Sequence, residues 1–419
     1  VRLPPVMTSP TPKIPQTDVS PMAARLQSHP RYYWFLVAFL VAMSALGSFV
    51  NDMYTPALPA MSRFFGCSIP TTQMGLTMGM LGLALGQIIL GPVSDRYGRR
   101  PVLIGSVALF IVAAVVSVFS PTIHFFIWCR LFQGFGASGG YFLARTIPAD
   151  VYHGRQLARL MALTGAINGV APASAPVIGG VTADAFGWQG IFVVLAVFGG
   201  LILAMSPWVR ESLAPSMRQR GTSLWRSFGG YLVLLRRRPF MTHVWFKGVA
   251  LGMLFAYISS SPFIFQDHYG LSQTLYGVVI GINSLFVAAG SLVALRFRLL
   301  KKAAYTGAIL LFAATLCECA ELWFIRNLWV YEGCTVVMLF GLGLIFTSAN
   351  TLAMNEGRDR AGEASSVLGV SGYIVGAIVS PLVGMDNIFH STALVYLAIA
   401  TVNLVLGFML RRLAPDLSK

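Results

Sequence analysis

The chain has 419 residues, of which 56% are hydrophobic and 11% are charged, and its mean hydropathy is +0.71. This composition indicates an integral membrane protein, with no polar stretch long enough for a separate soluble domain. The net charge of +15 does not indicate a nucleic-acid partner, because Lys and Arg gather in the loops on one side of the apolar segments. A solvated basic face for nucleic acid is therefore excluded.

Apolar segments of about 20 residues are long enough to cross a bilayer. We expect twelve of them, at residues 32–58, 71–92, 102–119, 123–145, 156–182, 189–207, 241–265, 273–295, 303–323, 329–352, 363–385 and 390–411. The loops on one side hold most of the basic residues, and those on the other side hold only Arg63 and Arg326. Both termini are therefore expected in the cytoplasm.

The two halves of the chain repeat each other. Thr55-Pro56 in the first segment matches Ser261-Pro262 in the seventh, and residues 175–179 in the fifth match 380–384 in the eleventh. A shared offset of 206 and 205 residues indicates a duplicated six-helix unit. We predict an all-α fold of 12 transmembrane helices in two pseudo-twofold-related bundles. Its parts are a disordered cytoplasmic tail (1–31), the N-terminal bundle (32–207), a cytoplasmic central loop (208–240), the C-terminal bundle (241–411) and a cytoplasmic tail (412–419).

An acid lies inside the first segment. Ser44, Ser48 and Asp52 recur every four residues and so share one helix face. An ionised Asp facing lipid costs about 2.5–3.5 kcal/mol, which predicts that this face meets a protein interior or a water-filled path. Solvation of Asp52 by headgroups at the helix end is the alternative.

Arg130 is the second charge within the membrane. Counting from the segment ends places Asp52 about 9 Å and Arg130 about 10 Å below the same face. Opposite charges at one depth predict a pair, and movement of Arg130 would then switch the protonation of Asp52. A purely structural ion pair, or an Arg bound to backbone carbonyls, explains the same residues.

Two short motifs stand out. The tight turn between segments two and three contains Asp95, which can accept hydrogen bonds from a helix start, and arginines that can clamp an acid such as Asp150. Its members are Gly91, Asp95, Arg96, Gly98, Arg99 and Arg100. The fifth segment has small residues and prolines at Gly165, Gly169, Pro172, Pro176, Gly179 and Gly180. Ordinary close packing of helices explains this second motif equally well.

The turn resembles the loop-two/three signature of the major facilitator superfamily, and the fifth segment is similar to the antiporter motif of its drug/proton exchangers, with Ala175 replacing a Gly. Together with residues 52–59, 259–263 and 362–369, these motifs resemble the Bcr/CflA group, which includes bicyclomycin-resistance proteins. The resemblance implies a latch between the two halves at the turn. It also implies proton-coupled export of small amphipathic drugs from a bacterium across its inner membrane by alternating access.

The substrate cavity is expected to include Asn51, Tyr54, Ser138, Tyr141, Asn168, Tyr257 and Asn283. Glu318, Glu321 and Glu332 lie near segment ends, where headgroup-level solvation is expected and a second proton or cation site is the alternative. No cofactor, metal or catalytic grouping is expected, and the protein is expected to act as a monomer. Metabolite transport on the same fold and a non-transporting receptor are the rival functions.

Overall fold

The computed structural model describes residues 20–28, 30–152, 154–218 and 229–412. Within these ranges it leaves undescribed the side chains of residues 27, 28, 30, 154–156, 158, 159, 161–169, 229, 230, 361, 411 and 412. This part of the chain is built from helices, with no strand among its elements. The first half comprises α1 (Pro21–Ser28), α2 (Pro30–Asp52), η2 (Thr55–Ala57), α3 (Leu58–Phe65), α4 (Ile69–Tyr97), α5 (Arg99–Val118), α6 (Ile123–Val151), α7 (Gly154–Met205), η3 (Ser206–Trp208) and η4 (Pro215–Met217). The second half comprises α9 (Gly229–Leu235), α10 (Arg238–Pro262), η5 (Phe263–His268), α11 (Gln273–Ala294), α12 (Leu300–Ala320), η6 (Glu321–Ile325), α13 (Leu328–Glu356), η7 (Arg358–Arg360), α14 (Ala361–Leu382) and α15 (Ile388–Arg412).

Each of the twelve predicted segments lies on a helix, which confirms the all-α fold class. Segments five and six are joined in α7, where the backbone bends at Gly187 with φ of +69°. Ten stretches of the described chain are long and apolar enough to cross a membrane. The tail that we expected to be disordered contains α1, which is a correction for residues 21–28; residues 1–19 lie outside the described part. The central loop likewise contains η4 and α9.

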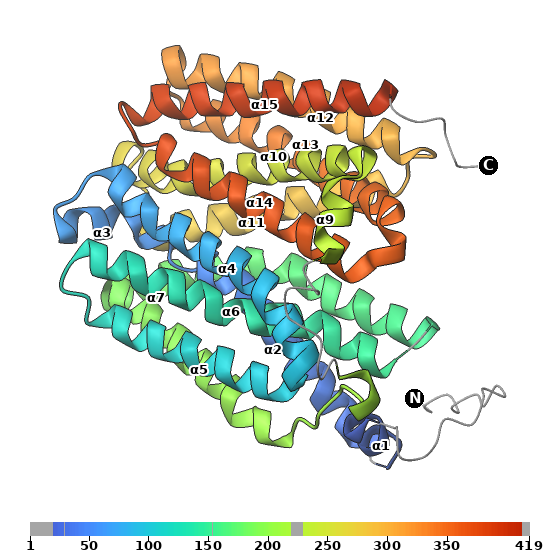
Figure 1. Cartoon of the computed structure of the whole chain (residues 1–419). Coiled ribbons are helices and arrows are strands. Elements are labelled where there is room, and N and C mark those ends of the chain that lie inside the picture. The colour runs from blue at the N-terminus through green and yellow to red at the C-terminus, as the bar shows by residue number, and fades with distance from the viewer. Residues whose placement is uncertain (1–19, 29, 153, 219–228, 413–419) are drawn as a thin grey trace.

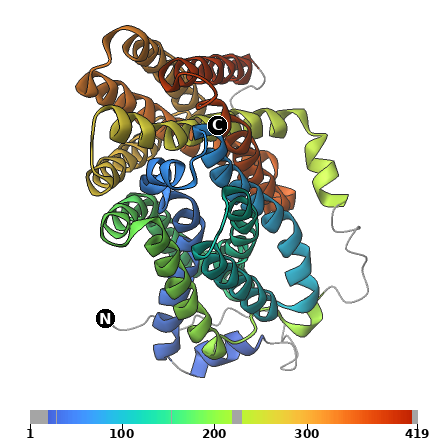
Figure 2. The same ribbon diagram turned by 90° about the vertical axis from the view of Figure 1, so that its left-hand side faces the viewer.

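The helices form two bundles with separate cores. One core gathers residues mainly from α2 to α7, and the other gathers residues from α10 to α15. In Figure 1 the first bundle, in blue and green, lies below the second, in yellow to red. The bundles meet where α4 packs against α14 and α7 packs against α11, and Figure 2 shows the same two groups from the side. A site between the bundles can therefore change when one bundle moves against the other.

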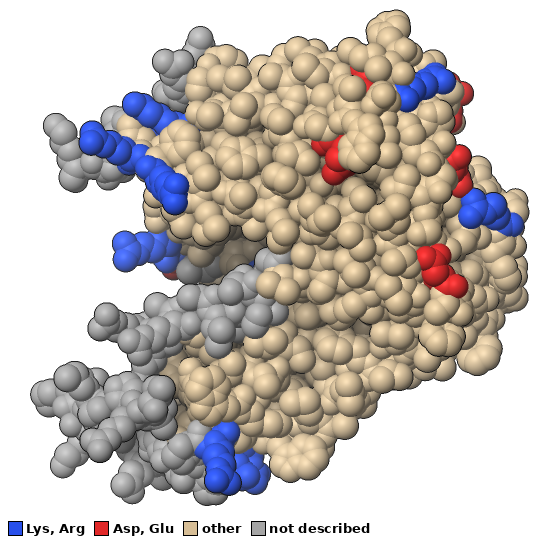
Figure 3. Space-filling model, turned by 180° about the vertical axis from the view of Figure 1, so that it is seen from behind, with Lys and Arg blue, Asp and Glu red and all other residues tan. Residues whose placement is uncertain are grey.

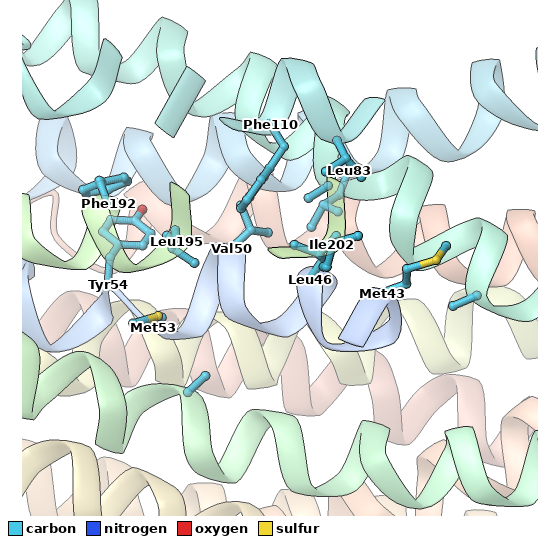
Figure 4. Close-up of a cluster of buried hydrophobic side chains, with 14 of the residues drawn as sticks. Met43, Leu46, Val50, Met53, Tyr54, Leu83, Phe110, Phe192, Leu195 and Ile202 are labelled. Atoms are coloured by element: carbon cyan, nitrogen blue, oxygen red, sulfur yellow. The ribbon is translucent and has the colours of Figure 1, made fainter. Parts of the chain in front are cut away.

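The first membrane helix presents two different faces. Figure 4 shows one face of α2 packed into the N-terminal core, where its side chains meet Leu83, Phe110, Phe192, Leu195 and Ile202. The residues of α2 and the turn after it that supply this face are Met43, Leu46, Val50, Met53 and Tyr54. The 3.6-residue period then turns Ser48 and Asp52 to the opposite side, toward the second bundle. The polar face predicted for this helix therefore faces the interior of the molecule and not lipid. Ser44, the third residue of that face, is buried and does not line the cavity.

Candidate functional site

A cavity of about 780 Å³ lies between the two bundles. Its walls come from α2, α6 and α7 of the first bundle and from α10, α11, α13 and α14 of the second. Most of the lining is apolar or hydroxylic, and three lining residues carry charge: Asp52, Arg145 and Lys247. Figure 3 shows the surface hollowed between the bundles at the end where basic side chains project. The cavity is thus open toward the end of the molecule at which α4 and α15 end.

The opposite end is closed by polar contacts between the bundles. Arg63 forms an ion pair of 2.7 Å with Asp267, and the amide nitrogen of Gln73 donates to the carbonyl of Ser259 at 3.0 Å. Three further bonds join the bundles at this end: Gln266 to the Pro56 carbonyl, Thr274 to the Asp184 carboxylate, and Thr77 to the Ala377 carbonyl. Several of these bonds use backbone carbonyls, so they need close approach of the helices and not only matching charges.

Small residues of the fifth-segment motif permit that approach. A Cβ on Gly180 would lie 2.3 Å from the carbonyl oxygen of Gln273, and one on Gly277 would lie 2.2 Å from that of Pro176. Both pairs join α7 to α11 across the bundle interface. Within the first bundle, Gly179 meets the Met53 carbonyl in the same way. The motif therefore builds the closed end, while the surroundings of Gly165 and Gly169 in α7 lie outside the described part.

Asp52 ends α2 and lines the cavity, where its side chain is half-buried. Its backbone carbonyl accepts a hydrogen bond of 2.8 Å from the Thr55 hydroxyl. Asp52 is the one acid among the described residues that line this cavity. Its carboxylate therefore faces the cavity, as the residue pattern predicted, and not the headgroup region.

The predicted pair between Asp52 and Arg130 is wrong for this structure. Arg130 is fully buried in the first bundle, and its Nη2 donates to the Val50 carbonyl at 2.5 Å. Its Nε donates to the Gly75 carbonyl at 3.4 Å, and its Nη1 to Gln133. The last four carbonyls of a helix lack intrahelical donors, and α2 ends two residues after Val50. Arg130 therefore caps the end of α2, the alternative that the sequence left open.

A ring packs on that arginine. The guanidinium carbon of Arg130 lies 4.2 Å from the ring centroid of Tyr54, within the range of a cation–π contact. Tyr54 is itself fully buried and packs against Phe126 and Phe192. Tyr54 was expected in the cavity, and this placement corrects that expectation, because the turn after Asp52 carries its ring into the first bundle.

The other expected cavity residues divide into three groups. Asn51, Tyr141, Tyr257 and Asn283 line the cavity, and the Asn283 amide donates to the Tyr257 hydroxyl at 2.8 Å. Ser138 does not line it: its side chain is buried, bonds to the Phe135 carbonyl, and lies against α4 at Gly86. The side chain of Asn168 lies outside the described part.

Sequence reasoning missed two cavity cations. Lys247 of α10 and Arg145 of α6 line the cavity from opposite bundles. Lys247 lies inside the predicted seventh segment, so its position as a charge within an apolar run was the signal that could have found it. Arg145 is the last residue of the predicted fourth segment and reads there as an ordinary loop charge.

The turn motif forms a cluster within one bundle. Arg99 donates to Asp95 at 2.5 Å and to Asp150 at 3.0 Å, so α4, α5 and α6 are joined at their ends. The Glu211 carboxylate, which sequence reasoning also missed, accepts from the backbone nitrogen of Arg99 at 2.9 Å and caps α5. Gly98 adopts a φ of +105°, and a Cβ there would lie 2.5 Å from that carboxylate.

The remaining motif residues also contact their own bundle. Gly91 lies against Phe142, Arg96 lies over the Tyr97 ring, and Arg100 donates to the Pro207 carbonyl. The latch between the two halves that the resemblance implied is not formed by the described residues. Because the molecule is open at this end, Arg99 and its acids organise the first bundle alone.

The acids of the second bundle correct another expectation. Glu318 and Glu321 are fully buried, not solvated at the headgroup level. Glu318 accepts from the Thr335 hydroxyl at 3.0 Å, and Glu321 accepts from the backbone nitrogen of Asn327 at 2.6 Å. Glu332 is partly buried beside Asn283. Helices α12 and α13 pack together here and enclose the Glu318 and Glu321 side chains. Their positions near segment ends had predicted solvation at the headgroup level.

Two helical bundles around a cavity that is closed at one end define the architecture of a membrane transporter. The family model "Major Facilitator Superfamily" matches residues 34–381, and the chain belongs to this superfamily. It is 34% identical over 384 residues to the "Uncharacterized MFS-type transporter YdgK" of Bacillus subtilis (strain 168), covering 88% of this chain and 93% of that protein. It is 26% identical over 354 residues to the "Multidrug resistance protein D" of Escherichia coli (strain K12), covering 80% and 84%.

The same fold occurs in a solved structure. A bacterial homologue of the human lysosomal transporter Spinster, in an inward-facing and unoccupied conformation, superposes with a TM-score of 0.75 and 14% sequence identity. The match covers 91% of this chain and 97% of that one. At this identity the similarity shows the fold alone. The family model and the relatives, taken with this architecture, identify the chain as a transporter of the superfamily and not an enzyme.

Proposed function

We propose that this protein exports small amphipathic drugs in exchange for protons, by alternating access. The observation that carries the proposal is the placement of one acid, Asp52, in a cavity that both bundles line. The multidrug-resistance relative supports a drug as the substrate. The loop charges support a cytoplasmic position for both termini and for the open end. A bacterial inner membrane is the proposed location.

Asp52 would carry the coupled proton. A carboxylate inside the membrane is stable when it is neutral or paired, so substrate and proton compete for its charge. Arg130 acts as a positioning residue in this scheme, because it holds the Val50 carbonyl and thereby the last turn of α2. That contact keeps Asp52 at the cavity wall without neutralising its charge.

The closed end supplies the moving part. Separation of α7 from α11 at Gly180 and Gly277 would open that end, while closure of the other end would cover Lys247 and Arg145. Each proton that enters releases about 2.3 kcal/mol per 100 mV of membrane potential and about 1.4 kcal/mol per pH unit. No nucleotide is required for this cycle.

Transport in proteoliposomes with an imposed pH gradient tests the proposal. A panel of neutral, cationic and zwitterionic antibiotics is assayed with the wild type, Asp52→Asn and Asp386→Asn. Asp386 is an exposed loop acid and provides the matched control. We expect the pH gradient to drive export by the wild type and by the control. Export by Asp52→Asn should no longer depend on the gradient. Full gradient-driven export by Asp52→Asn would exclude Asp52 as the coupling group, and transport of no compound on the panel would favour a metabolite.

A further inference from the structure

Two cations face each other across the cavity. Lys247 lies nine residues into α10, about 13 Å from the start of that helix, so it belongs to the membrane segment and not to a loop. Arg145 lies six residues before the end of α6. The two side chains come from different bundles and line the same cavity.

Neither cation has an acidic partner in the described part of the chain. The ammonium of Lys247 donates to the side-chain oxygen of Asn350 at 2.8 Å. The guanidinium of Arg145 donates to the hydroxyl of Tyr141 and lies 4.3 Å from its ring centroid. Both side chains are therefore held in place by neutral groups, which leaves their charges uncompensated.

Gly47 contributes to this arrangement. A Cβ at this position would lie 2.7 Å from the ring of Tyr141, so α2 must carry a glycine for the ring to reach its place. Tyr141 in turn accepts a hydrogen bond from the Arg145 guanidinium and contacts it with its ring. The position of the guanidinium is thus fixed by the packing of α2 against α6 and is not that of a freely moving surface arginine.

Like charges that line one cavity repel each other, and an anion between them offsets that repulsion. An arrangement that holds two of them together, and orients both with neutral hydrogen-bond acceptors, is suited to an anion that bridges them. We propose that Lys247 and Arg145 together bind an anionic group, such as a carboxylate, of the transported compound. The inference rests on the proposed function for the idea of a transported compound, but it specifies the chemistry of that compound.

Asp52 is the third charged residue that lines the cavity. Asp52 lies about 13 Å from Arg145 along the membrane axis, counted through the contact between Gly47 and Tyr141. Tyr373 lines the same cavity as both residues. A zwitterion with its anionic group at the two cations and a basic group at Asp52 matches this polarity. A basic group that reaches Asp52 also displaces its proton, as exchange requires.

A matched set of probes on one ring system tests the inference. Binding to the full chain in lipid nanodiscs is measured by equilibrium dialysis for 2-naphthoate, its neutral amide, 2-naphthylmethylammonium and zwitterionic 6-(aminomethyl)-2-naphthoate. Wild type, Lys247→Gln, Arg145→Gln and Lys247→Arg are compared, with the exposed Lys302→Gln as control. Monodisperse elution of each variant shows that it folds.

We expect the naphthoate to bind roughly tenfold more tightly than its amide, since one charge-assisted hydrogen bond contributes that much. Lys247→Gln and Arg145→Gln should each remove most of this preference, while Lys247→Arg and Lys302→Gln should retain it. The zwitterion should bind most tightly of the four.

Equal binding of naphthoate and amide, or a preference that survives both glutamine substitutions, would overturn the inference. Binding of none of the four probes would also overturn it. The proposed function fails separately, when proteoliposomes show no gradient-driven export. Lys247-dependent anion binding without proton-driven transport would therefore keep the anion site and reject the proton exchange.

Discussion

Substitution of Gly277 by Ala should open the closed end of the molecule. The new Cβ would lie 2.2 Å from the carbonyl oxygen of Pro176, whereas ordinary contact begins near 3.4 Å, so α7 and α11 must separate by roughly 1.2 Å. Overpacking of this kind costs about 1–3 kcal/mol. Because the two helices belong to different bundles, the cost applies to the state in which this end is closed. The equilibrium should move toward the opposite state by roughly 5- to 150-fold.

Spin labels at the closed end measure this shift. Cysteines replace the exposed Phe64 and Leu275 in a chain whose five native cysteines have been removed. Double electron–electron resonance should show a longer distance between the two spin labels in Gly277→Ala than in the labelled chain that keeps Gly277. Gly105→Ala, where a Cβ meets no atom within 4 Å, is the control and should leave the distances unchanged. An unchanged distribution in a folded Gly277→Ala protein would refute the packing argument.

Three further predictions concern buried polar groups. Arg130→Met should destabilise the protein by about 2–5 kcal/mol in unfolding titrations in mixed micelles, because the Val50 carbonyl loses its donor; a loss below 1 kcal/mol would argue against a capping role. Asp150→Asn should cost about 1–3 kcal/mol in the same titration, since Asp95 still partners the buried arginine of the turn, and a larger loss than that for Asp95→Asn is expected. Glu318→Gln should change stability by less than about 1 kcal/mol, because an amide oxygen can still accept from Thr335 in the enclosed site; a collapse of the fold would show that the charge itself is needed.

The fold followed from the sequence because its signals are local. Apolar length placed each predicted segment on a helix, and the repeated Pro56 and Pro262 indicated two halves before any contact was known. Helix boundaries were less well predicted. The first helix breaks after Asp52, where prolines follow at positions 56 and 59. Segments five and six meet at Gly187, whose positive, non-helical φ kinks the backbone of α7.

The site was harder to predict, because the depth of a residue in the membrane does not determine which way its side chain points. Counting residues placed Asp52 and Arg130 at one level, and Arg130 indeed contacts Val50 and Asn51, the two residues that precede the acid. One residue turns a helix by about 100°, which separates the face toward Arg130 from the face toward the cavity. The partner of Arg130 is a helix end, and no residue pattern marks a free carbonyl. The charge of Lys247 within an apolar segment was a usable signal, but its neutral partner Asn350 is distant in the sequence and could not be predicted.

In the proposed cycle Asp52 holds the proton that is exchanged during transport. The most direct test mixes purified protein, in weakly buffered detergent solution, with a saturating amount of the compound that proteoliposomes export best, and records the change in pH. The wild type and Asp386→Asn should release protons, and Asp52→Asn that still binds the compound should release none. An equal release by Asp52→Asn would contradict this role for Asp52.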